Sequence, residues 1–276
     1  LFKSMSKIHN NLLYFFQKIN LKKNNNSSNK NAKAITSQQK LFATSLIFYH
    51  KYNLKEDLIS KELSPSEQCL TYAACIFLAF KVFHLPKNVE LLAQIIQPHV
   101  IIDGKKAEIN EIKELIFQKE FDILLSIEFD IGIDLPYFFI SKFKKYLDNL
   151  NFSINRVNDL VRLLLIYIND SIIFPLYLHY TPNTIALSCI LLIKEKYKID
   201  ELNIDNLIQL SNYKIDIDSI KECSLIINKI IITKDKLALE KNKKLINQQN
   251  NVDKNKEDET NKINYKNIAT IKTNNN

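Results

Sequence analysis

Glycine is almost absent from this chain, at 2 of 276 residues, and tryptophan is missing altogether. Proline is also scarce, with 6 residues. A phosphate-binding P-loop needs two glycines at fixed spacing and a dinucleotide-binding fingerprint needs three, and Gly104 and Gly132 fit neither pattern. Turn-rich β-sandwiches and barrels are disfavoured for the same reason. What remains is a helical protein with polar connectors.

Metal-ligand spacing is also lacking. The chain has four cysteines, all in apolar stretches: Cys69, Cys75, Cys189 and Cys223. None forms a Cys-x-x-Cys pair, which excludes a zinc ribbon and favours reduced, buried thiols. His84 and His99 have no second ligand at metal spacing. We therefore expect no metal, no cofactor and no direct small-molecule ligand.

No apolar run resembles a membrane span. The longest uncharged stretch, 171–193, is interrupted by Pro175, His179 and Pro182. This interruption predicts two packed helices in place of one spanning segment, so no membrane partner is expected.

The formal net charge of +8 is concentrated in the flanks. Residues 1–40 hold eight lysines and no acid, and residues 234–276 hold ten lysines and six acids. The middle, 41–233, holds 20 basic and 24 acidic residues. A protein that binds nucleic acid usually carries a basic surface on its folded part. Because the middle of this chain has more acidic than basic residues, nucleic acid is not an expected partner. The Asn- and Lys-rich segments 21–34 and 237–276 are typical of solvated disorder.

Apolar residues recur at helical spacing in two sets of about five segments, separated by an extended connector at 129–136. The first set covers 9–20, 36–52, 64–83, 86–96 and 107–127. The second set covers 137–150, 157–172, 182–197, 204–210 and 219–233. A cap followed by proline opens the third segment of each set, at Ser64-Pro65 and Thr181-Pro182. Both third segments are apolar nearly all round, which predicts helices buried on every side.

Two five-helix sets, each with a buried third helix, resemble the cyclin fold. Five segments in the family's order, over roughly residues 6–233, are similar to transcription-type cyclins such as the L, K, T and C classes: SQQKLFATSLIFYHKY (37–52), AACIFLAFKV (73–82), QKEFDILLSIEFDI (118–131), YINDSI (167–172) and TPNTIALSCILLI (181–193). The resemblance implies an all-α fold of two consecutive five-helix cyclin boxes with disordered Asn/Lys-rich flanks. The boxes would cover residues 6–131, with a flexible connector at 21–34, and residues 132–236, followed by a disordered tail at 237–276.

The resemblance also implies a function. A chain of this family would be the regulatory subunit of a cyclin-dependent serine/threonine kinase, forming a heterodimer with it in transcription or RNA processing. Such a subunit activates the kinase and contributes no catalytic group. Its expected location is the nucleus, with or without a cytoplasmic pool.

Family-type kinase contacts fall on two charged residues, Lys81 and Glu120, which would hydrogen-bond backbone groups beside the kinase's mobile αC helix. The implied apolar contacts are Leu78, Val82, Leu124, Phe129 and Ile131. Leu124 follows Glu120 by one helical turn and Leu78 precedes Lys81 by nearly one, so each charge shares a helix face with an apolar anchor. Charges at the rim of an apolar patch orient a partner while the patch supplies the buried area.

Ordinary structural roles are the alternative for these residues. Lys81 would then be a helix-end cation, Glu120 a solvated helix position, and Phe129 and Ile131 core residues. The sequence also departs from the family pattern, because Phe83 and His84 stand where acidic residues commonly follow the helix-three lysine.

Two other functions stay open. One is a cyclin-fold transcription factor of the general-initiation type, whose zinc ribbon and basic surface are missing here. The other is a helical scaffold that binds no kinase. A kinase that co-purifies with the chain would favour the kinase-activating function over both of these alternatives.

Overall fold

The computed structural model describes residues 10, 11, 13, 14, 17, 32–55, 63–85, 88–211 and 213–240. The described residues up to Ile227 form one compact unit, and those from Asn228 onward belong to a second. The predicted first helix at 9–20, most of the connector 21–34 and the tail beyond residue 240 lie outside the described residues. None of the described helices is both long and apolar enough to cross a membrane.

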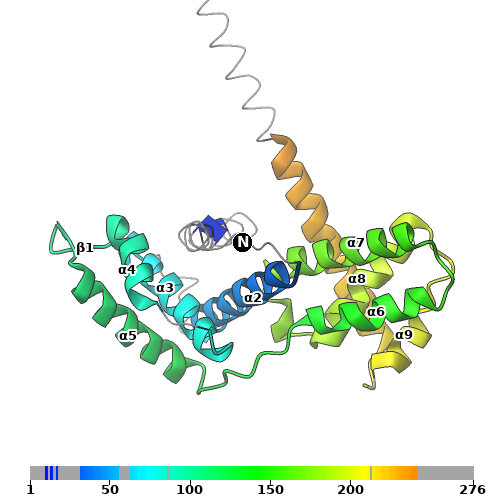
Figure 1. The fold of residues 1–276 in the computed structure, drawn as a ribbon, viewed down its shortest axis with the longest axis horizontal. Helices are drawn as coiled ribbons and strands as arrows, with labels where there is room; N and C mark the ends of the chain where they lie inside the picture. The colour runs from blue at the N-terminus through cyan, green and yellow to red at the C-terminus, as the bar shows by residue number, and fades with distance from the viewer. Residues whose placement is uncertain are drawn as a thin grey trace, which may run out of the picture. The chain divides into compact units, whose positions relative to one another are not determined.

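The first unit is almost entirely helical, which confirms the predicted all-α class (Figure 1). Its elements are α2 (Ala32–Lys55), α3 (Pro65–Val82), α4 (Val89–Ile96), η1 (Gln97–His99), β1 (Ile101–Ile102), β2 (Lys105–Lys106), α5 (Ile109–Ser126), η2 (Pro136–Phe138), α6 (Phe139–Asp148), α7 (Ile154–Ile172), η3 (Leu176–Leu178), α8 (Pro182–Tyr197) and α9 (Ile204–Ser211). Residues 217–240 are also helical.

Local hydrogen bonds fix the two central helices where the sequence predicts them. The Ser64 hydroxyl accepts the Glu67 backbone N–H at 3.2 Å, and the Glu67 carboxylate accepts the Ser64 N–H at 2.9 Å. This capping box satisfies two N–H groups that a helix start leaves open. Thr181 caps α8 with its side chain alone, through a 3.2 Å bond from the Thr184 N–H to the Thr181 hydroxyl. Pro65 and Pro182 follow the two caps at the first helical position.

The core sits around α3 and α8. Every residue of α3 from Leu70 to Phe80 is buried, and α3 packs against α2, α4 and α5 (Figure 1). Residues 183–190 of α8 are buried as well, and α8 packs against α7 and α9. The all-round apolar pattern of these two segments therefore correctly predicted their burial.

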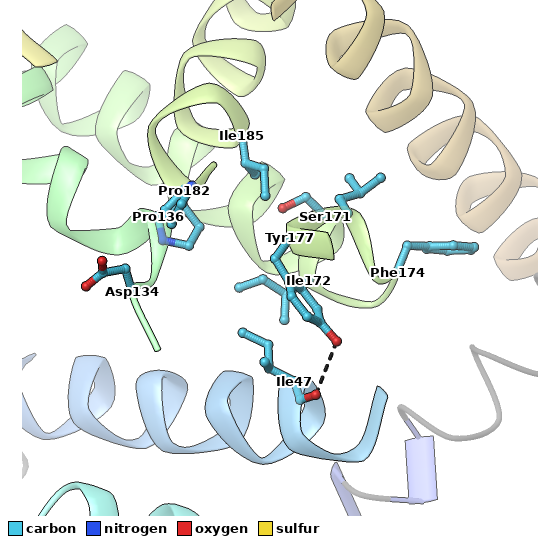
Figure 2. A pocket seen from close by; sticks show the side chains of 10 residues that line it. Ile47, Asp134, Pro136, Ser171, Ile172, Phe174, Tyr177, Pro182 and Ile185 are labelled. Atoms are coloured by element: carbon cyan, nitrogen blue, oxygen red, sulfur yellow. Dashed lines mark hydrogen bonds between the residues drawn. The ribbon is translucent and has the colours of Figure 1, made fainter. Parts of the chain in front are cut away.

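The two sets of helices are joined inside the first unit. Helix α2 packs against α7, and the Tyr177 hydroxyl donates a 3.2 Å hydrogen bond to the Ile47 carbonyl of α2. Figure 2 shows Tyr177 pointing at this carbonyl, beside Ile172 and Ile185 in a narrow apolar pocket. The boundary that we expect between residues 131 and 132 remains a prediction, since both sets belong to one compact unit.

Two predicted boundaries are corrected. Helix α2 begins at Ala32, inside the expected connector, because Ala and Lys are strong helix formers. The tail was expected from residue 237, but Leu, Ala, Leu and Glu extend the last helix through residue 240. Strands β1 and β2 form a hairpin, with Asp103 and Gly104 of its turn at φ of 49° and 77°. An Asp-Gly pair suits the two left-handed positions of such a tight turn.

Candidate functional site

The two charged residues singled out by sequence meet across the interface of α3 and α5. Lys81 Nζ donates a 2.6 Å hydrogen bond to Glu120 Oε2 and lies 2.5 Å from Oε1. The same ammonium lies 4.5 Å from the centre of the Phe77 ring. Lys81 lies in the last turn of α3, where the negative end of the helix dipole also stabilises its positive charge.

Glu120 is buried, which corrects both its expected place at the rim of an apolar patch and the alternative of a solvated helix position. Its exposed fraction is 5%, whereas the Lys81 side chain is 36% exposed. Glu120 Oε1 has no hydrogen-bond partner among the described residues. A buried carboxylate oxygen normally accepts a hydrogen bond, and here Oε1 is instead in ion-pair contact with the partly exposed Lys81 ammonium.

The predicted apolar contacts occupy three different depths. Leu78 is buried in the core, so it can only support the surface from below. Val82 and Leu124 are partly exposed beside the ion pair. Phe129 is 56% exposed and Ile131 is also exposed, so their alternative role as core residues is wrong. Their contact with a kinase remains a prediction.

Helix α5 carries an exposed apolar row that the sequence analysis did not assign to a site. Phe117, Phe121 and Leu125 recur every four residues and are all exposed, Phe121 by 56%. Ile112, Ile116 and Ile123 are instead fully buried on the side that packs against the bundle. The sequence of this helix indicates the exposed row, because α5 carries two rows of apolar residues and a helix that packs on one side needs only one.

We call the exposed part of this region the α3–α5 face. It consists of Lys81, Val82, Phe117, Phe121, Leu124, Leu125, Phe129 and Ile131, with Glu120 beneath Lys81. Phe117 connects the row to α3, because its ring lies 5.6 Å from that of Phe77. Contiguous exposed apolar residues beside a polar group are typical of a protein-binding surface.

The two departures from the family pattern lie at the end of α3. Phe83 caps this helix and is partly buried. His84 is exposed with a left-handed backbone, at φ of 51°. No acidic side chain stands at these two positions to meet a basic partner.

Titratable groups of the described residues show no catalytic arrangement. Burial raises the pKa of the Cys69 thiol to about 11, and raises the pKa of Cys75 and Cys189 further. Burial likewise raises the pKa of the Tyr49 hydroxyl. A thiol with a raised pKa stays protonated at neutral pH and is a poor nucleophile. Within the described residues, no three His, Cys, Asp or Glu side chains gather as a metal site would require.

Sequence comparison finds two cyclins. The chain is 26% identical to cyclin-K of Homo sapiens over 170 residues, which is 58% of this chain and 26% of that protein. It is also 26% identical to cyclin-K of Danio rerio over 159 residues, 57% of this chain and 35% of that protein. This chain therefore matches only about a quarter to a third of the length of these relatives. No protein-family model matches it.

Structure comparison finds the same fold in two assemblies. A chain of the CAK complex of Chaetomium thermophilum bound to ATP-gamma-S matches with a TM-score of 0.55 at 14% identity, covering 83% of this chain and 63% of that chain. A chain of the yeast TFIIK complex (Kin28/Ccl1/Tfb3) matches with a TM-score of 0.51 at 18% identity, covering 80% of this chain and 87% of that chain. These likenesses establish the fold, which is that of a cyclin.

Proposed function

We propose that this chain, which has a cyclin fold and is similar in sequence to cyclin-K, is the regulatory subunit of a cyclin-dependent protein kinase. It binds the kinase, activates it and contributes no catalytic group. The similarity to cyclin-K and to a chain of TFIIK supports a role in transcription or RNA processing. A nuclear location follows from that role.

The α3–α5 face is the observation that carries this proposal. Five large apolar side chains on α5 and the turn after it are exposed to solvent: Phe117, Phe121, Leu125, Phe129 and Ile131. Exposing this much apolar and aromatic surface is unfavourable for an isolated protein, and aromatic side chains dominate the energetics of protein interfaces. A helix of a partner laid on this face would bury them.

The Lys81–Glu120 ion pair fixes where along the α3–α5 face the helix of a partner binds. Lys81 has three N–H donors, and its ammonium contacts both carboxylate oxygens of Glu120, at 2.6 Å and 2.5 Å. When Lys81 turns toward the partner, its ammonium can donate to a backbone carbonyl and Glu120 becomes open to a backbone N–H. Charge-assisted hydrogen bonds of this kind are directional. They would therefore orient the partner helix, while the exposed apolar residues of α5 supply its buried contact area.

Activation then follows from differential binding. The kinase's αC helix exists in an inward and an outward position, and the α3–α5 face fits one of them. A ligand shifts such an equilibrium only by as much as it binds one state better than the other. Holding αC inward forms the kinase's own Lys–Glu pair, which positions the ATP phosphates for transfer.

Co-purification tests the proposed function. We expect a tagged full-length chain, isolated from its own cells, to carry one cyclin-dependent kinase in near-stoichiometric amount, identified by mass spectrometry. A chain that carries the Lys81→Met and Glu120→Leu substitutions together should lose that kinase. Recovery of polymerase and promoter-bound factors without a kinase would favour the transcription-factor alternative, and recovery of the chain without either would favour the scaffold.

A further inference from the structure

The turn after α5 has an unusual backbone for its residue types. Glu128 and Phe129 both adopt left-handed conformations, with φ of 55° and 57°. The Phe129 N–H bonds the Leu124 carbonyl at 2.8 Å, and the Glu128 N–H bonds the Leu125 carbonyl at 3.1 Å. These two bonds define a Schellman motif, in which Glu128 occupies the position that usually belongs to glycine.

A side chain at this position has a conformational cost. Left-handed backbone brings Cβ too close to the following carbonyl, and only glycine adopts it freely. Residues held in such conformations persist where the surrounding structure over-determines them, and they cluster at functional sites. The glutamate side chain offers what glycine lacks, a carboxylate that can form an ion pair.

Two lysines of α2 hold this turn. Lys55 forms an ion pair with the Glu128 carboxylate. Lys51 Nζ lies 2.7 Å from Asp130 Oδ2 and 3.4 Å from the Asp130 backbone oxygen. The hydrogen bond from Lys55 lowers the pKa of Glu128, so its carboxylate is ionised at neutral pH. The two lysines are spaced by one helical turn, and they form ion pairs with the residues on either side of Phe129.

We infer that Lys51 and Lys55 are positioning residues, which clamp the Glu128–Asp130 turn to α2 so that Phe129 projects from the α3–α5 face in its binding orientation. We call this arrangement the α2 clamp. The inference rests on the proposed function, because the orientation of Phe129 matters only if a partner receives it. The clamp works through preorganisation: a contact residue that is already fixed loses less conformational freedom on binding.

The first test removes the clamp and measures kinase binding. We expect Lys51→Met with Lys55→Met to weaken binding of the cyclin-dependent kinase about 3- to 20-fold, the range expected for two partly exposed ion pairs. The unfolding midpoint should stay within about 2 °C of the wild type. Reversing one pair, with Lys55→Glu and Glu128→Lys together, should bring binding back to near the wild-type value, whereas Lys55→Glu alone should not.

A glycine substitution separates the clamp from ordinary stabilisation. Glu128→Gly relieves the left-handed strain and should leave the chain as stable as the wild type or more stable. It also removes the ion pair to Lys55, so kinase binding should still weaken about 2- to 5-fold. If the ion pair only stabilised the fold, Glu128→Gly would change the unfolding midpoint and the kinase affinity in the same direction. Lys221→Met is the matched control, because it removes a similar exposed pair, with Asp218 at 3.3 Å, on a different helix.

A second measurement needs no kinase. The chain has no tryptophan, so Phe129→Trp introduces a single indole on the turn itself, which can be excited selectively at the red edge of its absorption, where tyrosine does not absorb. Time-resolved anisotropy should show restricted motion of this indole, and a larger nanosecond amplitude when Lys51→Met and Lys55→Met are added.

The outcomes separate this inference from the proposed function. The α2 clamp is refuted if the clamp variants bind the kinase like the wild type and leave the indole equally restricted, while the Lys81 and Glu120 double variant still loses the kinase. It is equally refuted if binding and the unfolding midpoint fall in parallel. A wild-type chain that binds no kinase would overturn the proposed function, whatever the anisotropy shows.

Discussion

Replacing Lys81 by methionine is expected to lower the free energy of unfolding by about 2–4 kcal/mol, because it leaves the buried Glu120 carboxylate without its cation. Glu120 is 5% exposed and accepts the Lys81 hydrogen bond at 2.6 Å. The loss falls somewhat below that of a fully buried pair, since Lys81 itself is partly exposed to water. Chemical denaturation of the purified variant measures this loss.

Replacing both partners should give a different result. With Lys81→Met and Glu120→Leu together, no buried charge remains, and apolar side chains of similar size fill the space. Exchanges of this kind are often neutral or stabilising, so we expect the double variant to be within about 1 kcal/mol of the wild type. Kinase binding should nevertheless weaken 10- to 100-fold, which corresponds to about 1.5–3 kcal/mol of lost charge-assisted hydrogen bonds.

The two variants together isolate the role of the pair in binding. Lys119→Met is a control on the same helix, since Lys119 lies 3.5 Å from Asp122 in an exposed pair and should change stability by less than about 1 kcal/mol. A double variant that is folded and binds the kinase with wild-type affinity would show that Lys81 and Glu120 serve only the fold.

The exposed aromatic residues of the α3–α5 face should show the opposite pattern, with a large loss of binding and a small loss of stability. Phe121→Ala and Phe129→Ala remove rings that are each 56% exposed. Aromatic anchors at interfaces commonly contribute 2 kcal/mol or more, so each variant should bind the kinase about 30-fold or more weakly. The free energy of unfolding should change by less than about 1 kcal/mol, as for other surface substitutions.

A core phenylalanine provides the matched control. Phe139 is fully buried, and Phe139→Ala should cost about 3–5 kcal/mol of stability by the lost burial and the cavity that remains. Titration of each variant against the kinase, beside its denaturation curve, makes the comparison. The interface would be refuted if Phe121→Ala and Phe129→Ala lowered the free energy of unfolding but left the kinase affinity of the folded chain unchanged.

Sequence alone predicted the parts of the fold that local chemistry decides. The Ser64 and Thr181 caps are completed by residues three positions later, so the starts of α3 and α8 needed no tertiary information. The apolar surface of these helices likewise predicted their burial. The Asp103-Gly104 hairpin was missed, although its turn signal is local, because strands of two residues leave almost no alternating pattern to detect.

The site was predictable only in part, since its geometry comes from contacts across the chain. Residues 81 and 120 could be proposed from the family pattern, but the burial of Glu120 depends on how α3 packs against α5. Helical spacing places Phe121 in an apolar row of α5, but it cannot tell which of two such rows faces inward. The clamp between Lys55 and Glu128 joins residues 73 positions apart, and no local pattern indicates it.

Activation of the kinase by the purified chain tests the central claim most directly. The co-purified cyclin-dependent kinase is expressed alone, and its phosphorylation of a peptide is measured while the wild-type chain or the Lys81→Met, Glu120→Leu double variant is added. We predict that the wild-type chain raises the rate at least 100-fold and saturates at one chain per kinase. The double variant should need a concentration 10 to 100 times higher for the same rate. A kinase rate that does not respond to the wild-type chain at saturating concentration would contradict the account.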